Sequence, residues 1–130
     1  NLRVAHGKRV VVSGNTFNPR QFTRPGTIVF EDSSDCVIAN NTLHKFTTPD
    51  GALILERCQG ISITGLVLSD CGSGIVLRNT SDTTIANCRA SRTAEGAADL
   101  SIDASNQNIL LIGNSFSGKS EVAATAVKSR

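Results

Sequence analysis

Apolar and polar residues alternate along five short runs of the chain, which begin at Val10, Cys36, Ile61, Thr83 and Ile109. A spacing of two is typical of β-strands that bury one face, whereas a helix repeats its apolar positions every three or four residues. The third residues of the runs follow one another at intervals of 26, 25, 22 and 26, and they are Val12, Ile38, Ile63, Ile85 and Leu111. A period of this size indicates a solenoid of stacked coils.

A second column predicts a sharp bend in every repeat. Two residues after the apolar column stand Gly14, Asn40, Gly65, Asn87 and Gly113. Glycine and asparagine are the residues that most easily adopt positive φ. The next column holds Asn15, Asn41 and Asn114, interrupted by Leu66 and Cys88, and we expect its asparagines to form hydrogen bonds between coils.

A further set of strands precedes these runs. Alternation places the following pairs inside: Ile28 and Phe30, Leu53 and Leu55, Ile75 and Leu77, Leu100 and Ile102. Polar turns separate each of these strands from the next run, at 32–35, 57–60, 79–82 and 104–108. The predicted fold is therefore all-β, a parallel β-solenoid of about five coils with 22 to 26 residues per coil.

Composition narrows the class of protein. The 130 residues suffice for one domain, and we expect residues 1–130 to form a single β-helix domain. No apolar run approaches the roughly 18 residues needed to cross a bilayer, so no membrane insertion is expected. The net charge of +2 and the 4% of aromatic residues argue against nucleic acid as a partner.

The ends of the predicted solenoid lack obvious caps. The segment before Lys8 is short and polar, and coils of a solenoid bury their core only against neighbouring coils. We therefore expect the chain to be a fragment of a longer β-helix. Self-association through uncapped coil ends is a second expectation.

The repeated pattern of two alternating apolar residues, Gly or Asn, Asn, and then Phe or Leu resembles the right-handed β-helix repeats of the pectate-lyase-like superfamily. The resemblance covers residues 8–118. The resemblance implies a right-handed parallel β-helix that binds or modifies a polysaccharide, with acidic polysaccharides as the expected substrate class. The implied activities are those of a lyase, hydrolase or epimerase, and the implied location is extracellular or periplasmic. Whether this chain is itself an enzyme stays open.

In that superfamily the substrate commonly lies along the first sheet, which here presents Glu31, Glu56, Arg78 and Asp103 at the strand ends. A lyase must neutralise the sugar carboxylate before a base removes the adjacent proton. Arg78 is the candidate for neutralisation, and Glu56 is a second catalytic candidate. A surface ladder of salt bridges explains the same column without chemistry.

Three further candidates lie in the loops. His44 and Lys45 are catalytic candidates as base or substrate clamp, and Arg92 is a substrate-binding candidate. Glu31 and Asp103, at the strand ends, are the other substrate-binding candidates. Glu31 and Glu56, one coil apart, also form the carboxylate pair that a retaining glycoside hydrolase would need. No known catalytic motif surrounds any of them.

No cofactor and no metal site are expected, although Asp99 and Asp103 leave a calcium site open. The four cysteines fall in different columns, which predicts buried free thiols rather than disulfides.

Two other functions remain as alternatives. A structural or adhesive β-helix stalk needs no cleft, and a protein-interaction scaffold would use the outward apolar residues Val29, Ile54 and Val76.

Overall fold

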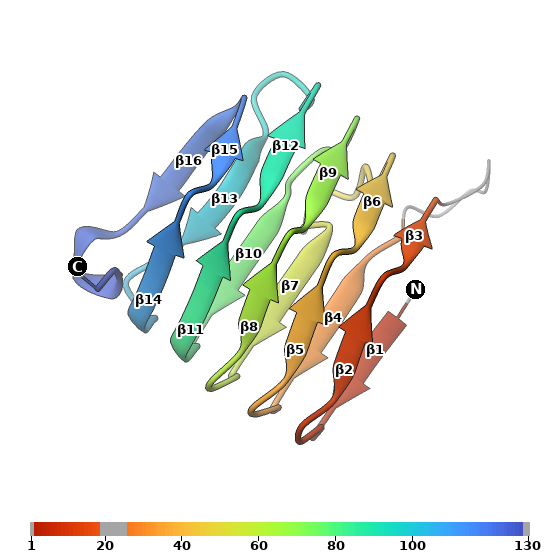
Figure 1. Ribbon diagram of the computed structural model, residues 1–130. Helices are drawn as coiled ribbons and strands as arrows, with labels where there is room; N and C mark the ends of the chain where they lie inside the picture. Colours follow the sequence, from red (N-terminus) through yellow and green to blue (C-terminus); the bar gives the residue numbers. More distant parts are fainter. Residues whose placement is uncertain (1, 19–25, 129–130) are drawn as a thin grey trace.

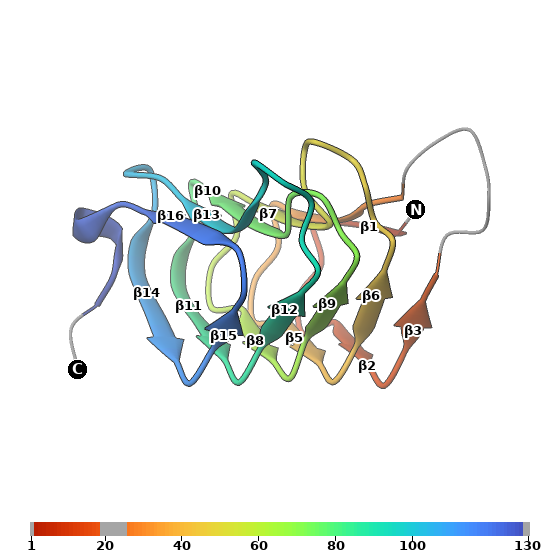
Figure 2. The ribbon, with the colours of Figure 1, turned by 90° about the horizontal axis from the view of Figure 1, so that it is seen from above.

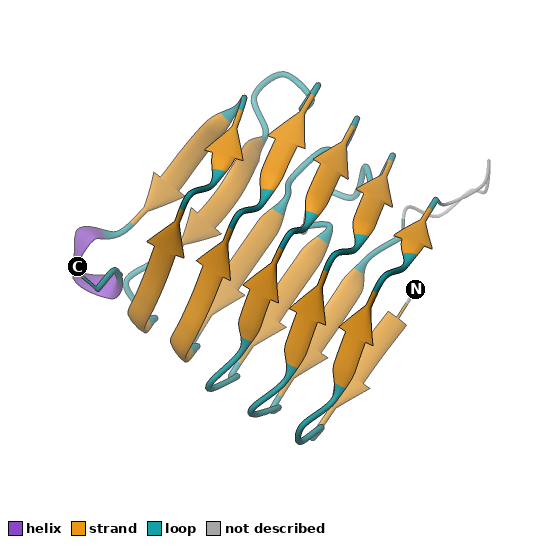
Figure 3. Ribbon diagram, viewed as in Figure 1, coloured by secondary structure: helices purple, strands orange, loops and turns teal. Residues whose placement is uncertain are grey.

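The computed structural model describes residues 2–18 and 26–128. It is a right-handed parallel β-helix with three parallel sheets (Figures 1 and 3). The first sheet contains β1 (Leu2–Ala5), β4 (Ile28–Glu31), β7 (Leu53–Glu56), β10 (Ile75–Arg78), β13 (Ala98–Ile102) and β16 (Lys119–Val122).

The other two sheets complete each coil. The second sheet contains β2 (Val11–Ser13), β5 (Val37–Ala39), β8 (Ser62–Thr64), β11 (Ser81–Ala86) and β14 (Gln107–Ile112). The third sheet contains β3 (Thr16–Phe17), β6 (Thr42–His44), β9 (Val67–Ser69), β12 (Arg89–Ser91) and β15 (Ser115–Phe116). The predicted fold class is confirmed.

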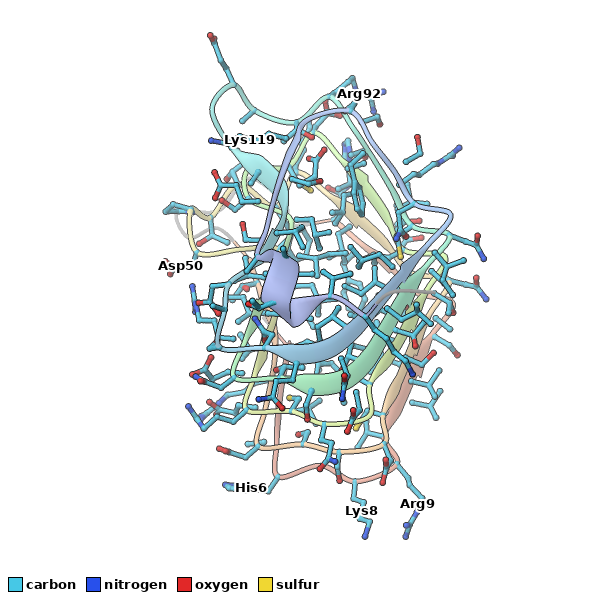
Figure 4. All side chains as sticks on the ribbon, turned by 90° about the vertical axis from the view of Figure 1, so that its left-hand side faces the viewer. His6, Lys8, Arg9, Asp50, Arg92 and Lys119 are labelled. Atoms are coloured by element: carbon cyan, nitrogen blue, oxygen red, sulfur yellow. The ribbon has the colours of Figure 1, made fainter. Side chains whose placement is uncertain are left out.

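The register of the second sheet is the one that the repeat predicts. Val12 pairs with Ile38, Ile38 with Ile63, Ile63 with Ile85 and Ile85 with Leu111. The alternate residues of the first sheet also point inward as expected, and Phe30, Leu55 and Ile75 are fully buried. These columns fill one continuous core that runs through the stacked coils (Figure 4).

The bend between the second and third sheets also follows the prediction. Gly14, Asn40, Gly65, Asn87 and Gly113 all have positive φ. The buried Asn41 accepts the backbone N–H of Asn15 through Oδ1 at 3.0 Å and donates to the carbonyl oxygen of Val12 at 2.9 Å. Asn114 makes the equivalent pair of bonds to the preceding coil. These amides satisfy backbone groups that the turn leaves unpaired, which holds neighbouring coils in register.

The C-terminal end is partly covered. The 3-10 helix η1 (Ala124–Ala126) lies across the last coil, where Ala126 is fully buried and Val127 pairs with Ile109 (Figures 2 and 4). The sixth strand of the first sheet, β16, precedes this helix and ends at Val122, which pairs with Ile102. Beside η1 a hollow of about 310 Å³ stays open, lined by Leu111, Phe116 and Val122 among others. The part of the chain that the structure describes contains no helix long and apolar enough to cross a membrane.

Candidate functional site: a groove on the first sheet

A loop from the third sheet covers part of the outer face of the first sheet. Phe46 and Thr48 anchor residues 45–52 in the interior. Gly51 adopts φ 140°, and an added Cβ there would lie 2.8 Å from Cγ2 of Val76 and 3.1 Å from Cγ1 of Ile54. Only glycine allows this close approach. Ile54 and Val76 are consequently buried, so the chain's own loop covers two of the three residues of the expected apolar strip, while Val29 is half-buried.

The edge of this loop and the neighbouring strands enclose a hollow of about 210 Å³. We call it the first-sheet groove, and its lining includes Asp50, Ser73, Val76, Arg78, Ser101 and Asp103. In Figure 4 Asp50 projects on the first-sheet side of the coil. The groove therefore combines two carboxylates, one guanidinium and two hydroxyl groups over an apolar floor.

Charge in the groove is fixed by local contacts. The backbone N–H of Ser105 donates to Oδ1 of Asp103 at 3.0 Å, and the Ser105 hydroxyl donates to the same oxygen. These bonds hold the pKa of Asp103 below its ordinary value, with a smaller contribution from the Arg78 charge. Asp103 is therefore ionised at neutral pH. Arg78 is exposed and makes no ion pair with any residue of the described segments.

The groove continues along the solenoid axis. A second hollow, of about 370 Å³, shares Ser101 and Asp103 with the first and extends to Glu121 on β16. Both hollows are open to solvent along the first sheet. The surface can thus accommodate an elongated ligand that crosses several strands.

The predicted column of charges is present, but its ion pairs run differently from a simple ladder. Glu31, Glu56 and Arg78 are in register on neighbouring strands. Glu31 pairs with Arg3, and Glu56 accepts from Nη1 of Arg57 at 3.0 Å. Both carboxylates that a hydrolase would use are therefore held by arginines outside the groove. The second oxygen of Glu56 is buried without a hydrogen-bond partner among the described residues.

Arg57 is the centre of this network, and the sequence interpretation did not include it. Its guanidinium donates to Oδ1 of Asp32 at 2.8 Å and to Oδ2 at 3.2 Å. This contact holds the pKa of Asp32 below its usual value. The only signal in the sequence is the position of Arg57 directly after Glu56 at the turn.

His44, Lys45 and Arg92 lie at the opposite end of the coil, in the turn from the third sheet to the first. Nδ1 of His44 is 2.6 Å from Oγ of Ser69 and 3.6 Å from Oδ2 of Asp70. Because both contacts involve the same ring nitrogen, they do not form the relay of a catalytic triad. Arg92 binds Asp70 at 2.9 Å and lowers its pKa. Figure 4 shows Arg92 at this edge, away from Asp50.

The residues named from sequence are therefore divided among three places. Arg78 and Asp103 line the groove. Glu31 and Glu56 form ion pairs with Arg3 and Arg57. His44, Lys45 and Arg92 lie in the turn from the third sheet to the first. Their catalytic and substrate-binding roles stay predictions. Two lining residues, Asp50 and Ser73, were not among the site residues proposed from sequence. The Pro49-Asp50-Gly51 turn signal in a long loop was the available indication.

The candidate calcium residues do not converge. Asp99 is buried at a bulge of β13, where it accepts from the Thr93 hydroxyl and from the backbone N–H of Gly118 at 2.6 Å. Asp103 instead faces Ser105. Across the described residues, no three His, Cys, Asp or Glu side chains form a group that could hold a metal ion.

The cysteines are free and buried, as predicted. The Sγ of Cys58 donates to the carbonyl oxygen of Phe30 at 3.2 Å, and that of Cys71 donates to Leu43 at 3.4 Å. Burial raises the pKa of the Cys58, Cys71 and Cys88 thiols. They therefore stay protonated and pack as small side chains.

Comparison with known proteins gives one result. Residues 1–129 match the NosD family, described as "Periplasmic copper-binding protein (NosD)", whereas no curated protein and no solved structure matches the chain. The resemblance to the pectate-lyase-like superfamily thus stays a prediction beyond the shared parallel β-helix. The periplasmic description agrees with the expected location. Because the match extends over almost the whole sequence, the chain belongs to the NosD family.

Proposed function

We propose that this chain is a periplasmic β-helix domain that binds a polysaccharide segment in the first-sheet groove without cleaving it. The observation that carries the proposal is the lining of that groove, where Arg78, Asp103 and hydroxyl groups face one open channel. Sugar hydroxyls both donate and accept hydrogen bonds. A carboxylate, a guanidinium and a serine hydroxyl together offer acceptors and donors for them.

The elongated shape supports a chain ligand. The two connected hollows extend from the 45–52 loop to β16. Because the 45–52 loop leaves only 8% of Val76 exposed, we expect the polar side chains of the lining to supply most of the contacts with the ligand.

Binding without cleavage fits the charges better than catalysis. A general acid for glycosidic cleavage needs a raised pKa, whereas the pKa of Asp103 is lowered. Glu31 and Glu56 are held by Arg3 and Arg57. His44, the imidazole expected as the base, lies outside the groove that Arg78 lines.

Copper, the metal in the family's description, does not fit the residues described here. Cu(II) favours imidazole ligands and Cu(I) favours thiolate or thioether sulfur. The sequence contains no methionine and only two histidines. His6 follows β1 of the first sheet and His44 ends β6 of the third sheet, so they lie in different turns of the coil. All four thiols are buried, and burial raises the pKa of Cys58, Cys71 and Cys88. No copper chemistry is therefore attributed to these residues.

The test is a titration with two probes, an oligogalacturonate and a neutral gluco-oligosaccharide, followed by calorimetry. Arg78→Ala should weaken oligogalacturonate binding about 10- to 100-fold, because a charge-assisted hydrogen bond contributes about 1.5 to 3 kcal/mol. Binding of the neutral probe should change less. Stability should be unchanged, since Arg78 makes no ion pair with the described residues.

Arg89→Ala is the matched control, because Arg89 is also exposed but lies on β12 of the third sheet. It should leave the affinity for both probes unchanged. The proposal fails if wild-type protein binds neither probe at millimolar concentration, or if Arg78→Ala and Arg89→Ala have equal effects.

A further inference from the structure

Arg78 and Asp103 carry opposite charges side by side in the first-sheet groove, yet they do not pair. Leu77 on β10 pairs with Ile102 on β13, so the next residues, Arg78 and Asp103, are neighbours about 4.8 Å apart across the sheet. Neither an ion pair nor a hydrogen bond joins these two described residues. Both side chains are exposed, so each charge is open to a ligand.

Neighbouring groups hold the carboxylate of Asp103 in place. The backbone N–H and the hydroxyl of Ser105 and the Nδ2 of Asn106 all donate to its Oδ1, the last at 3.2 Å. These bonds fix the orientation of the carboxylate and leave its Oδ2 without a hydrogen bond from any described residue. Because an ionised carboxylate accepts at both oxygens, Oδ2 can bind a donor from a ligand.

The donors of Arg78 are free because its other neighbour is also engaged elsewhere. Glu56 on β7 pairs in register with Arg78 on β10. Its Oε1 accepts from Nη1 of Arg57 at 3.0 Å and from Nδ2 of Asn79 at 3.4 Å. Arg78 forms no ion pair with the described residues. Its guanidinium therefore offers a planar fork of donors, which matches the geometry of a carboxylate.

Asp50 adds a second carboxylate to the same hollow. It lies on the 45–52 loop, projects on the first-sheet side of the coil and lines the hollow together with Arg78 and Asp103 (Figure 4). Its backbone N–H donates to Oγ1 of Thr48 at 3.4 Å, but its carboxylate forms no ion pair with the described residues. The hollow thus contains one guanidinium and two carboxylates, each with unused hydrogen-bonding capacity.

These three groups fit a ligand that carries charges of both signs. A glycan with carboxylates alone would bring them close to Asp50 and Asp103, and a glycan with amines alone would bring an ammonium close to Arg78, so like charges would repel in either case. A glycan with both groups can satisfy all three side chains. Building on the proposed function, we propose that the first-sheet groove binds a zwitterionic glycan, in which Arg78 binds a carboxylate and Asp103 and Asp50 bind a protonated amine.

The charge of the whole chain opposes a preference for amines. The net charge is +2, so the long-range field repels a cationic group, and salt screens this field beyond about 10 Å. A preference for a free amine must therefore come from groups that contact it. This makes the preference a specific report on the two carboxylates of the groove.

The test compares two oligosaccharides of equal length that differ only at the amine. One alternates glucuronic acid with glucosamine, and the other is the same oligosaccharide with its amines acetylated. Calorimetry is performed in mildly acidic solution, where the free amines are protonated and the lowered pKa of Asp103 keeps its carboxylate ionised. The wild-type chain should bind the free-amine form about 10-fold more tightly, which is the effect of one charge-assisted hydrogen bond.

Asp50→Ala should reduce this preference to about 3-fold or less, because one of the two carboxylates is gone. For the same reason it should bind the acetylated form at least as tightly as the wild type does. Asp103→Asn, which can still accept from Ser105, should also reduce the preference. Glu95→Ala is the matched control, since Glu95 is exposed on the loop between β12 and β13 and lines neither hollow.

The outcomes separate this proposal from the one on which it rests. Equal binding of both oligosaccharides by the wild type, with Arg78→Ala weakening both, would overturn the zwitterionic ligand and leave polysaccharide binding in the groove intact. Equal effects of Asp50→Ala and Glu95→Ala would also overturn it. A wild-type chain that binds neither oligosaccharide, nor the oligogalacturonate and neutral probes, would overturn both proposals.

Discussion

Ile63 shows at the scale of one residue how the repeat becomes a core. It lies on β8 between Ile38 and Ile85 in the inward column of the second sheet, and its side chain is fully buried. Because identical shapes stack at the strand spacing, each apolar residue contacts neighbours both above and below. A cavity at this position cannot be filled by a single neighbour's rearrangement.

We therefore expect Ile63→Ala to lower the free energy of unfolding by about 2 to 5 kcal/mol. Urea unfolding followed by circular dichroism measures this change. Val67→Ala on the outer face of β9 is the comparison, because Val67 is only half-buried, and it should cost less. A loss below about 0.5 kcal/mol for Ile63→Ala, the usual surface value, would contradict the assigned register.

Asn41 and the buried thiols illustrate a second role for single residues. Asn41 uses both ends of its amide on the preceding coil. Cys88, in the same column, cannot do so, and its Sγ donates to the carbonyl oxygen of Ala86 at 3.4 Å. The backbone N–H of Cys88 still donates to Asn114 of the following coil, as that of Asn15 donates to Asn41. One asparagine can therefore serve a neighbour that lacks the amide.

At the scale of the element, ion pairs as well as backbone hydrogen bonds hold together the turns between the first and second sheets. Arg57 joins Asp32 to Glu56 across two coils. The hydrogen bond from Arg57 lowers the pKa of Asp32. Arg92 lowers the pKa of Asp70 in the same way, in the turn from the third sheet to the first. A carboxylate whose pKa is lower in the folded than in the unfolded state contributes stability above its unfolded pKa, about 3.9. That contribution is lost as the pH falls through the folded pKa.

Stability should therefore fall between about pH 4 and pH 2, and Arg57→Gln should make this fall shallower because Asp32 returns to its ordinary pKa. Urea unfolding at a series of pH values measures the slope. Arg89→Gln, which removes a charge that has no ion pair with the described residues, should keep the wild-type slope. An unchanged slope in Arg57→Gln would mean that the pair does not persist in solution.

At the scale of the whole molecule, coils support one another only through their nearest neighbours. The core is continuous from the first coil to η1, but Leu2, Val12, Leu111 and Phe116 at the two ends are only partly buried. The hollow beside η1 lies at one of these ends. Self-association through the coil ends remains a prediction.

Rates of amide hydrogen exchange should depend on whether a coil has a neighbour on one side or on both. We expect amides of β7, β8 and β10 to exchange most slowly, because coils on both sides protect them, and those of β2 and β3 to exchange faster. Mass spectrometry of peptides after exchange at several times measures this gradient. Equal protection of β2 and β8 in dilute solution would show that the first coil is covered by something other than its single neighbour.

The repeat by itself determined the three-sheet coil, the inward columns and the bends at Gly14, Asn40 and Gly65. Each depends on the alternation of neighbouring residues or on a residue that tolerates positive φ, and both can be recognised in a short stretch of sequence. The order of columns also placed Glu31, Glu56 and Arg78 side by side, as the register shows.

The tertiary structure decided everything that depends on long side chains and loops. Arg57, rather than Arg78, pairs with Glu56, because flexible side chains choose among several partners within reach. The 45–52 loop covers Ile54 and Val76 and forms the wall of the groove, since Gly51 lets the backbone approach the sheet. Neither this ion pair nor the position of the loop repeats from coil to coil, so the repeat does not predict them. The family resemblance directed attention to the first sheet, but the lining of the groove became known only when the loop was placed.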